Sequence, residues 1–331
     1  MKHRILIVTH SHDLHADLVM PMLARRGRAP LRLDLDAFPR DYELEQSIKE
    51  GYLFTRLRTL PGGDWVDLDE VGAVWVRKAA DYAYRSELGA QERAFARRET
   101  EQALFGVLYS LDCFWMSHPR ALRGAQWKGE QLVRAARMGF TVPASVVTNS
   151  PGAARRFHAA ARGPVVFKSL STPTLARDDV RPDQRVAGGL ATTIVDDTML
   201  ADLDAVAELP CHFQHYIAKR YELRVTVVGE RVFAARIDSQ DDPRTAIDSR
   251  DMSAPVRYSA WTLPPEVARR CVAFVRSYDL SYGAIDLIVT PDGDHVFLEN
   301  NPAGQFLYVQ ELVPELRIME AVADLLAGVT Q

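Results

Sequence analysis

Three side chains near the end of the sequence carry oxygen atoms that could share one metal ion. Asp286 is a lone carboxylate in the apolar run AIDLIV, and Glu299 and Asn301 follow in HVFLENN after a Pro-Asp-Gly-Asp turn. Burying an unpaired carboxylate costs several kcal/mol, so such a residue is normally paired or bound to a metal. The turn predicts a hairpin, and alternation places Glu299 and Asn301 on one face of its second strand. Oxygen ligands without His or Cys favour Mg²⁺.

These residues also have a simpler interpretation, in which Asp286 forms a salt bridge and Glu299 lies on the surface. Two arginines favour the site over this alternative. Arg224 in ELRVTV and Arg236 in FAARID lie on predicted strands that can pair with the hairpin. The Arg side chain binds phosphate bidentately, so both residues are candidates to bind a polyphosphate beside the metal.

Lysine is scarce in this sequence, since only six of the 40 basic residues are Lys. Lys168 ends the apolar run VVFK, and Lys128 follows Trp127 at the start of a predicted helix. For Lys128 alone, a solvated helix face is the simpler interpretation. For Lys168 a functional role is favoured, because the strand that it closes is expected to be buried. Both lysines lie where a nucleotide phosphate could be bound.

Composition restricts the class of protein. The 331 residues, 47% hydrophobic and 25% charged, are typical of a globular protein of two or three domains. A net charge of −4 argues against non-specific nucleic-acid binding. The three Cys residues form no C-x-x-C spacing, which argues against a zinc knuckle or a disulfide framework. With no signal peptide and no apolar run long enough to span a bilayer, we expect a soluble cytoplasmic protein that does not interact with membranes.

The elements that must position these residues fall into two kinds of pattern. Over the first 115 residues, strands alternate with helices, which indicates an open α/β domain, although no G-x-G-x-x-G motif is present. The expected strands there are 4–9, 31–35 and 71–76, and the helices are 17–26 and 90–111. A second segment contains helix 126–139, strand 145–148, a helix from 151 to about 161 and strand 165–168. Residues 169–189 show no periodicity and are predicted to form a loop or a loosely ordered hairpin.

From about residue 210 the pattern becomes a series of strands with hairpin spacing, which indicates an α+β unit. The strands are 211–216, 222–228, 231–238, 284–290 and 295–300, with helices at 264–278 and 313–326. We therefore predict three domains: an N-terminal α/β domain at 1–116, a central lid domain at 117–209 and a C-terminal domain at 210–331.

Several of these segments resemble the ATP-grasp superfamily of carboxylate–amine ligases. The matching set comprises Lys128, Lys168, FQHYI at 213–217, ELRVTVVG at 222–229, YGAIDLIV at 282–289 and FLENNPAGQF at 297–306. The segments ILIVT at 5–9, LDLDAFP at 33–39, AVWVRK at 73–78 and SQ at 239–240, with the triplet at 248–250, are similar to one branch, the maturases of microviridins and related graspetides. These are ribosomal peptides cross-linked by ester or amide bonds. The resemblance runs from residue 4 to about 326 and implies an ATP-grasp fold preceded by an N-terminal open α/β pre-ATP-grasp domain.

The resemblance also implies a role for individual residues. Those expected to bind ATP are Lys128 and Lys168 at the phosphates, Gln214, His215, Tyr216 and Ile217 as the hinge at adenine, Glu222 near the ribose or a lysine, and Leu298 under adenine. Those expected to hold two Mg²⁺ ions are Asp286, Glu299 and Asn301. Those expected at the γ-phosphate, the acceptor carboxylate or the acyl phosphate are Arg224, Asp248 and Arg250, together with Arg77 and Arg236. Asn300 stands where Ile is common, and by alternation it faces away from the metals.

The implied activity is an ATP-dependent macrocyclase that acts on a ribosomal precursor peptide with a leader and a Thr- and Glu-rich core. It would join Asp or Glu side chains to Thr or Ser as esters, or to Lys as amides, through an acyl phosphate. The leader could dock at 177–185 and 192–195, and family members often form homodimers. Two alternatives remain open: a free-standing ligase for amino acids or protein glutamylation, and a non-catalytic nucleotide-binding regulator.

Overall fold

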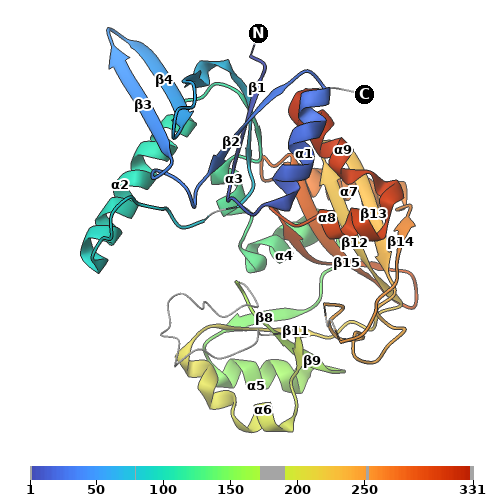
Figure 1. The fold of residues 1–331 in the computed structure, drawn as a ribbon. Helices are drawn as coiled ribbons and strands as arrows, with labels where there is room; N and C mark the ends of the chain where they lie inside the picture. The colour runs from blue at the N-terminus through green and yellow to red at the C-terminus, as the bar shows by residue number, and fades with distance from the viewer. Residues whose placement is uncertain (1, 79, 172–190, 251–252, 329–331) are drawn as a thin grey trace.

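The structure is a computed structural model that describes residues 2–78, 80–171, 191–250 and 253–328. Its described strands form four sheets. Figure 1 shows the N-terminal and C-terminal parts side by side, with the central sheet, which contains β8, β9 and β11, as a separate layer below them. The mixed α/β fold agrees with the fold class that the sequence predicts.

The N-terminal sheet is parallel, in the order β2-β1-β6-β7. Its strands are β1 (Arg4–Thr9), β2 (Ala29–Asp34), β6 (Val71–Val76) and β7 (Phe114–Met116), and the flanking helices are α1 (Leu14–Arg25) and α2 (Ala90–Tyr109). Strand β1 is buried on both faces, as its continuous apolar run predicts. Ile5 and Ile7 pack in a core with α1, whereas Leu6 and Val8 pack in a second core with α2.

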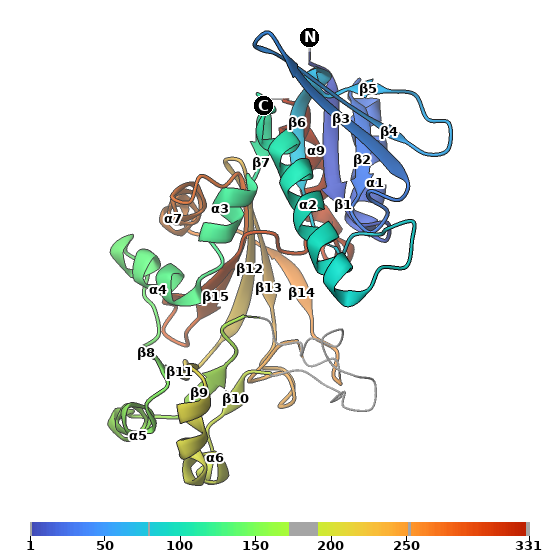
Figure 2. The ribbon, with the colours of Figure 1, turned by 90° about the vertical axis from the view of Figure 1, so that its left-hand side faces the viewer.

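An antiparallel sheet that the sequence did not predict extends from this domain. It consists of β3 (Tyr42–Lys49), β4 (Tyr52–Thr59) and β5 (Val66–Asp67), followed by the 3₁₀ turn η1 (Leu68–Glu70). In Figures 1 and 2, β3 and β4 lie beside α2 and away from the central sheet. Ion pairs between facing residues of the two strands, Glu43 with Arg58 and Glu45 with Arg56, stabilise the hairpin.

The central sheet has the order β10-β9-β11-β8 and is antiparallel. Its strands are β8 (Ser145–Thr148), β9 (Val165–Lys168), β10 (Thr193–Ile194) and β11 (Cys211–His215), and its helical segments are α5 (Pro151–Ala160), α6 (Asp197–Ala201) and η3 (Leu203–Glu208). Strand β11 lies between β9 and β8, although the run of strands from about residue 210 predicts it to be part of the C-terminal domain. We therefore propose that the central domain ends after His215 rather than at residue 209.

The start of the expected lid domain also belongs elsewhere in this topology. Helix α4 (Lys128–Arg137) contributes Leu132 and Ala135 to a core shared with the C-terminal sheet, and Ala125, the residue after helix α3 (Pro119–Gly124), joins the same core. We propose that the central domain begins near β8 and that α3 and α4 are part of the C-terminal layer.

The C-terminal sheet is antiparallel, in the order β14-β13-β12-β15-β16. Its strands are β12 (Tyr221–Val228), β13 (Arg231–Ile237), β14 (Tyr258–Trp261), β15 (Tyr282–Val289) and β16 (His295–Asn301), and its helical segments are α7 (Pro265–Arg276), α8 (Leu307–Leu312), η4 (Pro314–Leu316) and α9 (Ile318–Ala327). One face packs against α4 and α7 around Phe274 and Phe297. On the other face, Val228 and Ala235 join a core with α1 and α9, while the opposite ends of the strands border a pocket.

Among the described residues, no helix combines the length and the apolar character needed to cross a membrane.

Candidate active site

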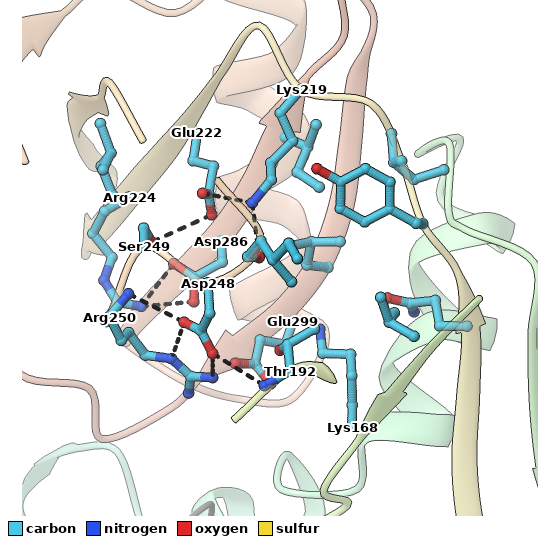
Figure 3. Close-up of a pocket in the computed structure, with 18 of the residues that line it drawn as sticks. Lys168, Thr192, Lys219, Glu222, Arg224, Asp248, Ser249, Arg250, Asp286 and Glu299 are labelled. Atoms are coloured by element: carbon cyan, nitrogen blue, oxygen red, sulfur yellow. Dashed lines mark hydrogen bonds and ion pairs between the residues drawn. The ribbon is translucent and has the colours of Figure 1, made fainter. Parts of the chain in front are cut away.

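A pocket lies between the central sheet and the C-terminal sheet (Figure 3). One wall is formed by β9 and β11, the other by β12, β15 and β16, and the segment 247–250 closes one side. Most predicted site residues line this pocket: Lys128, Lys168, Gln214, His215, Tyr216, Ile217, Glu222, Arg224, Asp248, Arg250, Asp286, Leu298 and Glu299. The structure therefore brings together groups from positions 128 to 299, far apart in sequence.

Arg224 and Asp286 face each other across β12 and β15. The Nη1 atom of Arg224 donates to both carboxylate oxygens of Asp286, at 2.9 and 3.0 Å, and its Nε donates to the hydroxyl of Tyr308 at 3.1 Å. Burial raises the pKa of Asp286 to about 6; the Arg224 guanidinium opposes this rise, and the Glu299 carboxylate adds to it. The carboxylate is therefore held in a site where a further positive charge would stabilise its ionised form.

Glu299 reaches the same site because strand β16 contains a bulge. Asp286 pairs with Glu299 and Leu287 pairs with Phe297, so Leu298 is the extra residue. Leu298 and Glu299 consequently both line the pocket. The carboxylate of Glu299 lies 3.0 Å from Nζ of Lys128, and the side chains are 27% and 19% exposed, respectively.

The charges around Glu299 keep it ionised. Burial, the largest effect, raises the pKa of the Glu299 carboxyl, but the ammonium groups of Lys128 and Lys168 outweigh it and lower this pKa overall. Lys128 also donates to the carbonyl of Ser169 at 3.0 Å. Burial lowers the pKa of Lys168, which makes no ion pair within the described parts of the chain. An anion that enters this end of the pocket meets the ammonium groups of Lys128, which is paired with Glu299, and of Lys168, which has no ion pair among the described residues.

Asp286 and Glu299 fit a magnesium site in their chemistry. They are facing carboxylates whose mutual repulsion a divalent cation would relieve. The described residues contain no group of three His, Cys, Asp or Glu side chains arranged for a metal. A cation here would thus need oxygen ligands from water and phosphate as well, as is usual for Mg²⁺. The third predicted ligand, Asn301, lies outside the pocket lining, and its Oδ1 accepts from the N–H of Ala303 at 3.2 Å.

The end of β11 forms the wall where the hinge is expected. Gln214 is buried and donates to the hydroxyl of Ser145 at 3.0 Å, and the backbone N–H of Tyr216 donates to the carbonyl of Pro164 at 2.9 Å. These hydrogen bonds connect the hinge to Ser145 in β8 and to Pro164, the residue before β9. Leu298 lies across the pocket from this wall, so a flat apolar ring could be held between them.

A second charged cluster includes a residue that the sequence analysis missed. Lys219 donates to Glu222 at 2.9 Å and to the carbonyl of Ile247 at 3.1 Å, and its side chain is 3% exposed. It is one of only six lysines, so the same scarcity that selected Lys128 could have selected it. Figure 3 shows Lys219 and Glu222 at one end of the pocket.

Asp248 and Arg250 form the side wall of the pocket. Arg250 binds Asp248 through Nε at 2.8 Å and Nη2 at 2.5 Å, and Asp248 also accepts from the N–H of Thr192 at 3.1 Å. Burial raises the pKa of the Asp248 carboxyl, but the hydrogen bonds and charge of Arg250 outweigh it and lower the pKa to about 2. The pair links the C-terminal domain to the residue before β10.

Two predicted arginines lie elsewhere. Arg236 faces Leu223 in the sheet register, on the opposite face from Arg224, and it binds Asp238 at 2.7 Å. Its guanidinium lies 4.2 Å from the ring centre of Tyr221. The structure therefore contradicts the prediction that Arg236 and Arg224 bind one phosphate together. Alternation along each strand does not reveal which of its faces coincides with a given face of the neighbouring strand.

Arg77 is also outside the pocket. It is 4% exposed, it lies 3.5 Å from Asp13, and its Nη1 donates to the carbonyl of Ala303 at 3.1 Å. It therefore does not face a substrate carboxylate in this structure. The predicted docking segment 177–185 lies outside the described residues.

Comparisons with known proteins agree with this architecture. Residues 4–123 match the family model described as the MvdD pre-ATP grasp domain. A comparison with curated protein sequences finds no match. The chain is similar to the ATP-grasp ligase PsnB, solved with a phosphomimetic variant of a minimal precursor, Mg and ADP, with 25% identity, coverage of 99% of this chain and 98% of that chain, and a TM-score of 0.74.

Two other solved structures are more similar in sequence. Macrocyclase MdnC from Microcystis aeruginosa MRC, bound with precursor peptide MdnA, shares 28% identity over 98% of this chain and 99% of that chain, with a TM-score of 0.84. The Chryseobacterium gregarium RiPP-associated ATP-grasp ligase, solved with ADP and a leader and core peptide, shares 32% identity over 99% of this chain and 98% of that chain, with a TM-score of 0.88. RiPP denotes a ribosomally synthesised and post-translationally modified peptide. The resemblance seen in the sequence is confirmed, and the chain belongs to the RiPP-associated ATP-grasp ligases.

Proposed function

We propose that this protein is an ADP-forming macrocyclase that cross-links side chains of a ribosomal precursor peptide at the expense of ATP. The observation that carries the proposal is a single pocket in which two cation–carboxylate pairs, Arg224 with Asp286 and Lys128 with Glu299, lie beside a hinge. Likeness to ligases solved with nucleotide and peptide supports it.

The nucleotide would bind with its base between the hinge and Leu298 and its phosphates toward Lys128 and Lys168. Lys168 contributes an ammonium group with no ion pair among the described residues, and Lys128 lies beside it at the end of the pocket that contains Glu299. Glu222, oriented by Lys219, is placed to accept hydrogen bonds from ribose hydroxyl groups. Positioning and charge neutralisation are the main requirements for phosphoryl transfer.

Asp286 and Glu299 are the residues that would hold Mg²⁺, and we propose that water and phosphate oxygens complete its coordination. A bound Mg²⁺ would neutralise negative charge on the phosphate oxygens during transfer. When these carboxylates serve a metal, Arg224 and Lys128 become available to the phosphates. The two pairs thus keep both carboxylates neutralised until the metal and the nucleotide bind.

The reaction would proceed in two steps. A carboxylate oxygen of a Glu or Asp side chain attacks the γ-phosphorus, ADP leaves, and an acyl phosphate forms. A Thr or Ser hydroxyl oxygen then attacks the acyl carbon, inorganic phosphate leaves, the hydroxyl loses its proton, and an ester forms; a Lys amine gives an amide instead. Arg224 would bind the γ-phosphate, and Arg250, held by Asp248 on the side wall, would bind the carboxylate or the acyl phosphate.

The precursor would need to dock outside the reacting centre. Among the described strands, β10 (Thr193–Ile194) lies at an edge of the central sheet, so an extended leader segment could pair with the side of β10 that no described strand occupies. The adjoining N–H of Thr192 is bonded to Asp248, which connects this edge to the pocket wall. We propose that leader binding at this edge is sensed at the Asp248–Arg250 pair.

The test is incubation of the protein with ATP, Mg²⁺ and a Thr- and Glu-rich precursor peptide encoded beside its gene, followed by mass spectrometry. The expected result is the loss of one water per cross-link with one ADP formed for each. Hydroxylamine treatment distinguishes esters, which it cleaves, from amides. An unchanged peptide alongside rapid turnover of free amino acids would replace the proposal with a free-standing amino-acid ligase.

A further inference from the structure

Helix α8 begins without a capping side chain of its own. Its N-cap residue, Phe306, makes no side-chain hydrogen bond to the helix. Instead, Nε2 of His15, near the start of α1, accepts hydrogen bonds from the N–H groups of Phe306 and Leu307, both at 3.3 Å. The first N–H groups of a helix have no partner within it. A histidine of the N-terminal domain therefore caps a helix of the C-terminal domain.

Asp13 holds His15 in this orientation. One carboxylate oxygen of Asp13 lies 3.4 Å from Nδ1 of His15, and the other accepts from the hydroxyl of Thr9 at 2.6 Å. A proton on Nδ1, pointing to Asp13, leaves Nε2 as an acceptor. Burial is the largest effect on the pKa of His15 and lowers it; Asp13 opposes this shift, while the charges of Arg77 and Lys78 add to it. The neutral imidazole is the form that two N–H donors require.

Two further hydrogen bonds hold the chain just before α8. Nη1 of Arg77 donates to the carbonyl of Ala303 at 3.1 Å, and the hydroxyl of Tyr282 donates to the carbonyl of Gly304 at 2.8 Å. Arg77 lies 3.5 Å from Asp13, so one buried ion pair supports both the cap and this segment. The backbone between β16 and α8 is thus fixed by side chains from other elements.

Helix α8 carries a residue of the pocket. Tyr308 is its second residue, it lines the pocket, and its hydroxyl accepts from Nε of Arg224 at 3.1 Å. The same guanidinium binds Asp286 through Nη1. The path from the cap at His15 to Arg224 therefore consists of a short rigid helix start and one hydrogen bond. A misplacement of about 1 Å at a reacting group can cost about 100-fold in rate.

We propose that His15, oriented by Asp13, is a positioning residue of the ligase: it caps α8 and thereby places Tyr308 against Arg224. The N-terminal domain would then set the geometry of the phosphate-binding arginine without touching substrate. This inference rests on the proposed function, because it assigns His15 a role only through a catalytic Arg224.

The test compares His15→Phe, which keeps a ring against Phe306 but removes the acceptor, with His15→Gln, whose side-chain oxygen can accept near the position of Nε2. His118→Phe is the matched control, since Nδ1 of His118 caps α3 by accepting from the N–H of Arg120 at 3.2 Å and His118 does not line the pocket. We expect His15→Phe to lower kcat for cross-linking by about 10- to 100-fold with little change in the KM for ATP. His15→Gln should restore most of the rate, and His118→Phe should retain it.

A second measurement is independent of activity. The Nε–H resonance of Arg224 in ¹⁵N-labelled protein, identified by its absence in Arg224→Lys, should shift in His15→Phe and stay in place in His15→Gln and His118→Phe. An unchanged resonance with unchanged kcat in His15→Phe would overturn the inference. The inference would also be overturned if His15→Gln lost as much rate and as much thermal stability as His15→Phe, because the role of His15 would then be purely structural. If the native protein forms no cross-links, the proposed function fails, while the resonance still decides whether His15 positions Arg224.

Discussion

Replacing Glu299 by Gln separates catalysis from stability at this site. The carboxylate lies 3.0 Å from Lys128, is also attracted by the charge of Lys168, and faces Asp286 across the sheet, which repels it. The Gln oxygen can still accept from Lys128. The change from a charge-assisted to a neutral hydrogen bond costs about 1 kcal/mol, and relief of the repulsion with Asp286 offsets part of it. We therefore expect the free energy of unfolding to fall by about 1 kcal/mol or less.

The effect on the reaction should be much larger. A neutral amide is a poor ligand for Mg²⁺, and the loss of one preorganised electrostatic contact to the transition state typically costs about 100- to 1000-fold in kcat. That corresponds to about 3 to 4 kcal/mol in the barrier, which exceeds the expected loss of stability. ADP release in a coupled assay and urea unfolding at the same pH measure the two quantities on one sample.

The control is Glu266→Gln, which removes an exposed glutamate on α7 that pairs with Arg269 and Arg270. Both its rate and its stability should be close to those of the native protein. A Glu299→Gln variant that releases ADP at the native rate would show that the metal and phosphates bind elsewhere. A loss of about 3 kcal/mol or more with native activity per folded molecule would instead identify Glu299 as a structural partner of Lys128.

Three further outcomes follow from the surrounding contacts. Arg236→Met should lower the free energy of unfolding by about 1 kcal/mol, because Asp238, which is 5% exposed, loses this ion pair but keeps its pair with Arg257 at 2.9 Å, while cross-linking per folded molecule is unchanged. The depressed pKa of Asp248, about 2 against 3.8, stabilises the folded state above its unfolded pKa. The native protein should therefore lose about 2 kcal/mol of its stability advantage over the Asp248→Asn variant as the pH falls from about 5 to 2, as measured by urea unfolding at each pH. His212→Leu should leave the melting temperature unchanged or raise it, because neither ring nitrogen of His212 has a partner among the described residues.

Local sequence patterns were sufficient to predict the bounds of several secondary-structure elements. The strands 71–76, 145–148 and 165–168 were predicted with the bounds that the structure shows, because each is a short run of β-branched or apolar residues between turn residues. The start of α5 at Pro151 was also predicted correctly. These features depend on neighbours in sequence alone.

Other elements could not be predicted because their pattern is weak or is overridden. Strand β3 (Tyr42–Lys49) is exposed in its second half, and its alternation of Tyr42, Leu44 and Ile48 is interrupted at Gln46, so its apolar pattern is weak. The single helix expected at 313–326 is interrupted at η4 (Pro314–Leu316), where Arg317 adopts a left-handed conformation with φ of 51° before α9 begins. Helix α1 begins earlier than the expected residue 17 because Asp13 caps it.

The candidate site shows which information a sequence lacks. Alternation along each strand correctly separated Asn300, which is buried, from the pocket side of the sheet. It could not show that Arg236 and Arg224 occupy opposite faces, nor that a bulge at Leu298 turns Glu299 toward Asp286, because both depend on the pairing register between strands. The pairing of charges is likewise a property of the register.

That register explains how a pocket rich in charge can exist without ligand. Each carboxylate that we assign to the metal is paired with a cation that we assign to phosphate, so both carboxylates are compensated when no ligand is bound, and of these charged groups Lys168 alone lacks an ion-pair partner among the described residues. A metal ion that binds the two carboxylates frees Arg224 and Lys128 for the phosphates of the nucleotide. A nucleotide that binds these two cations in turn frees the carboxylates for the metal. Magnesium and nucleotide should consequently bind with positive coupling, and either ligand alone should bind weakly.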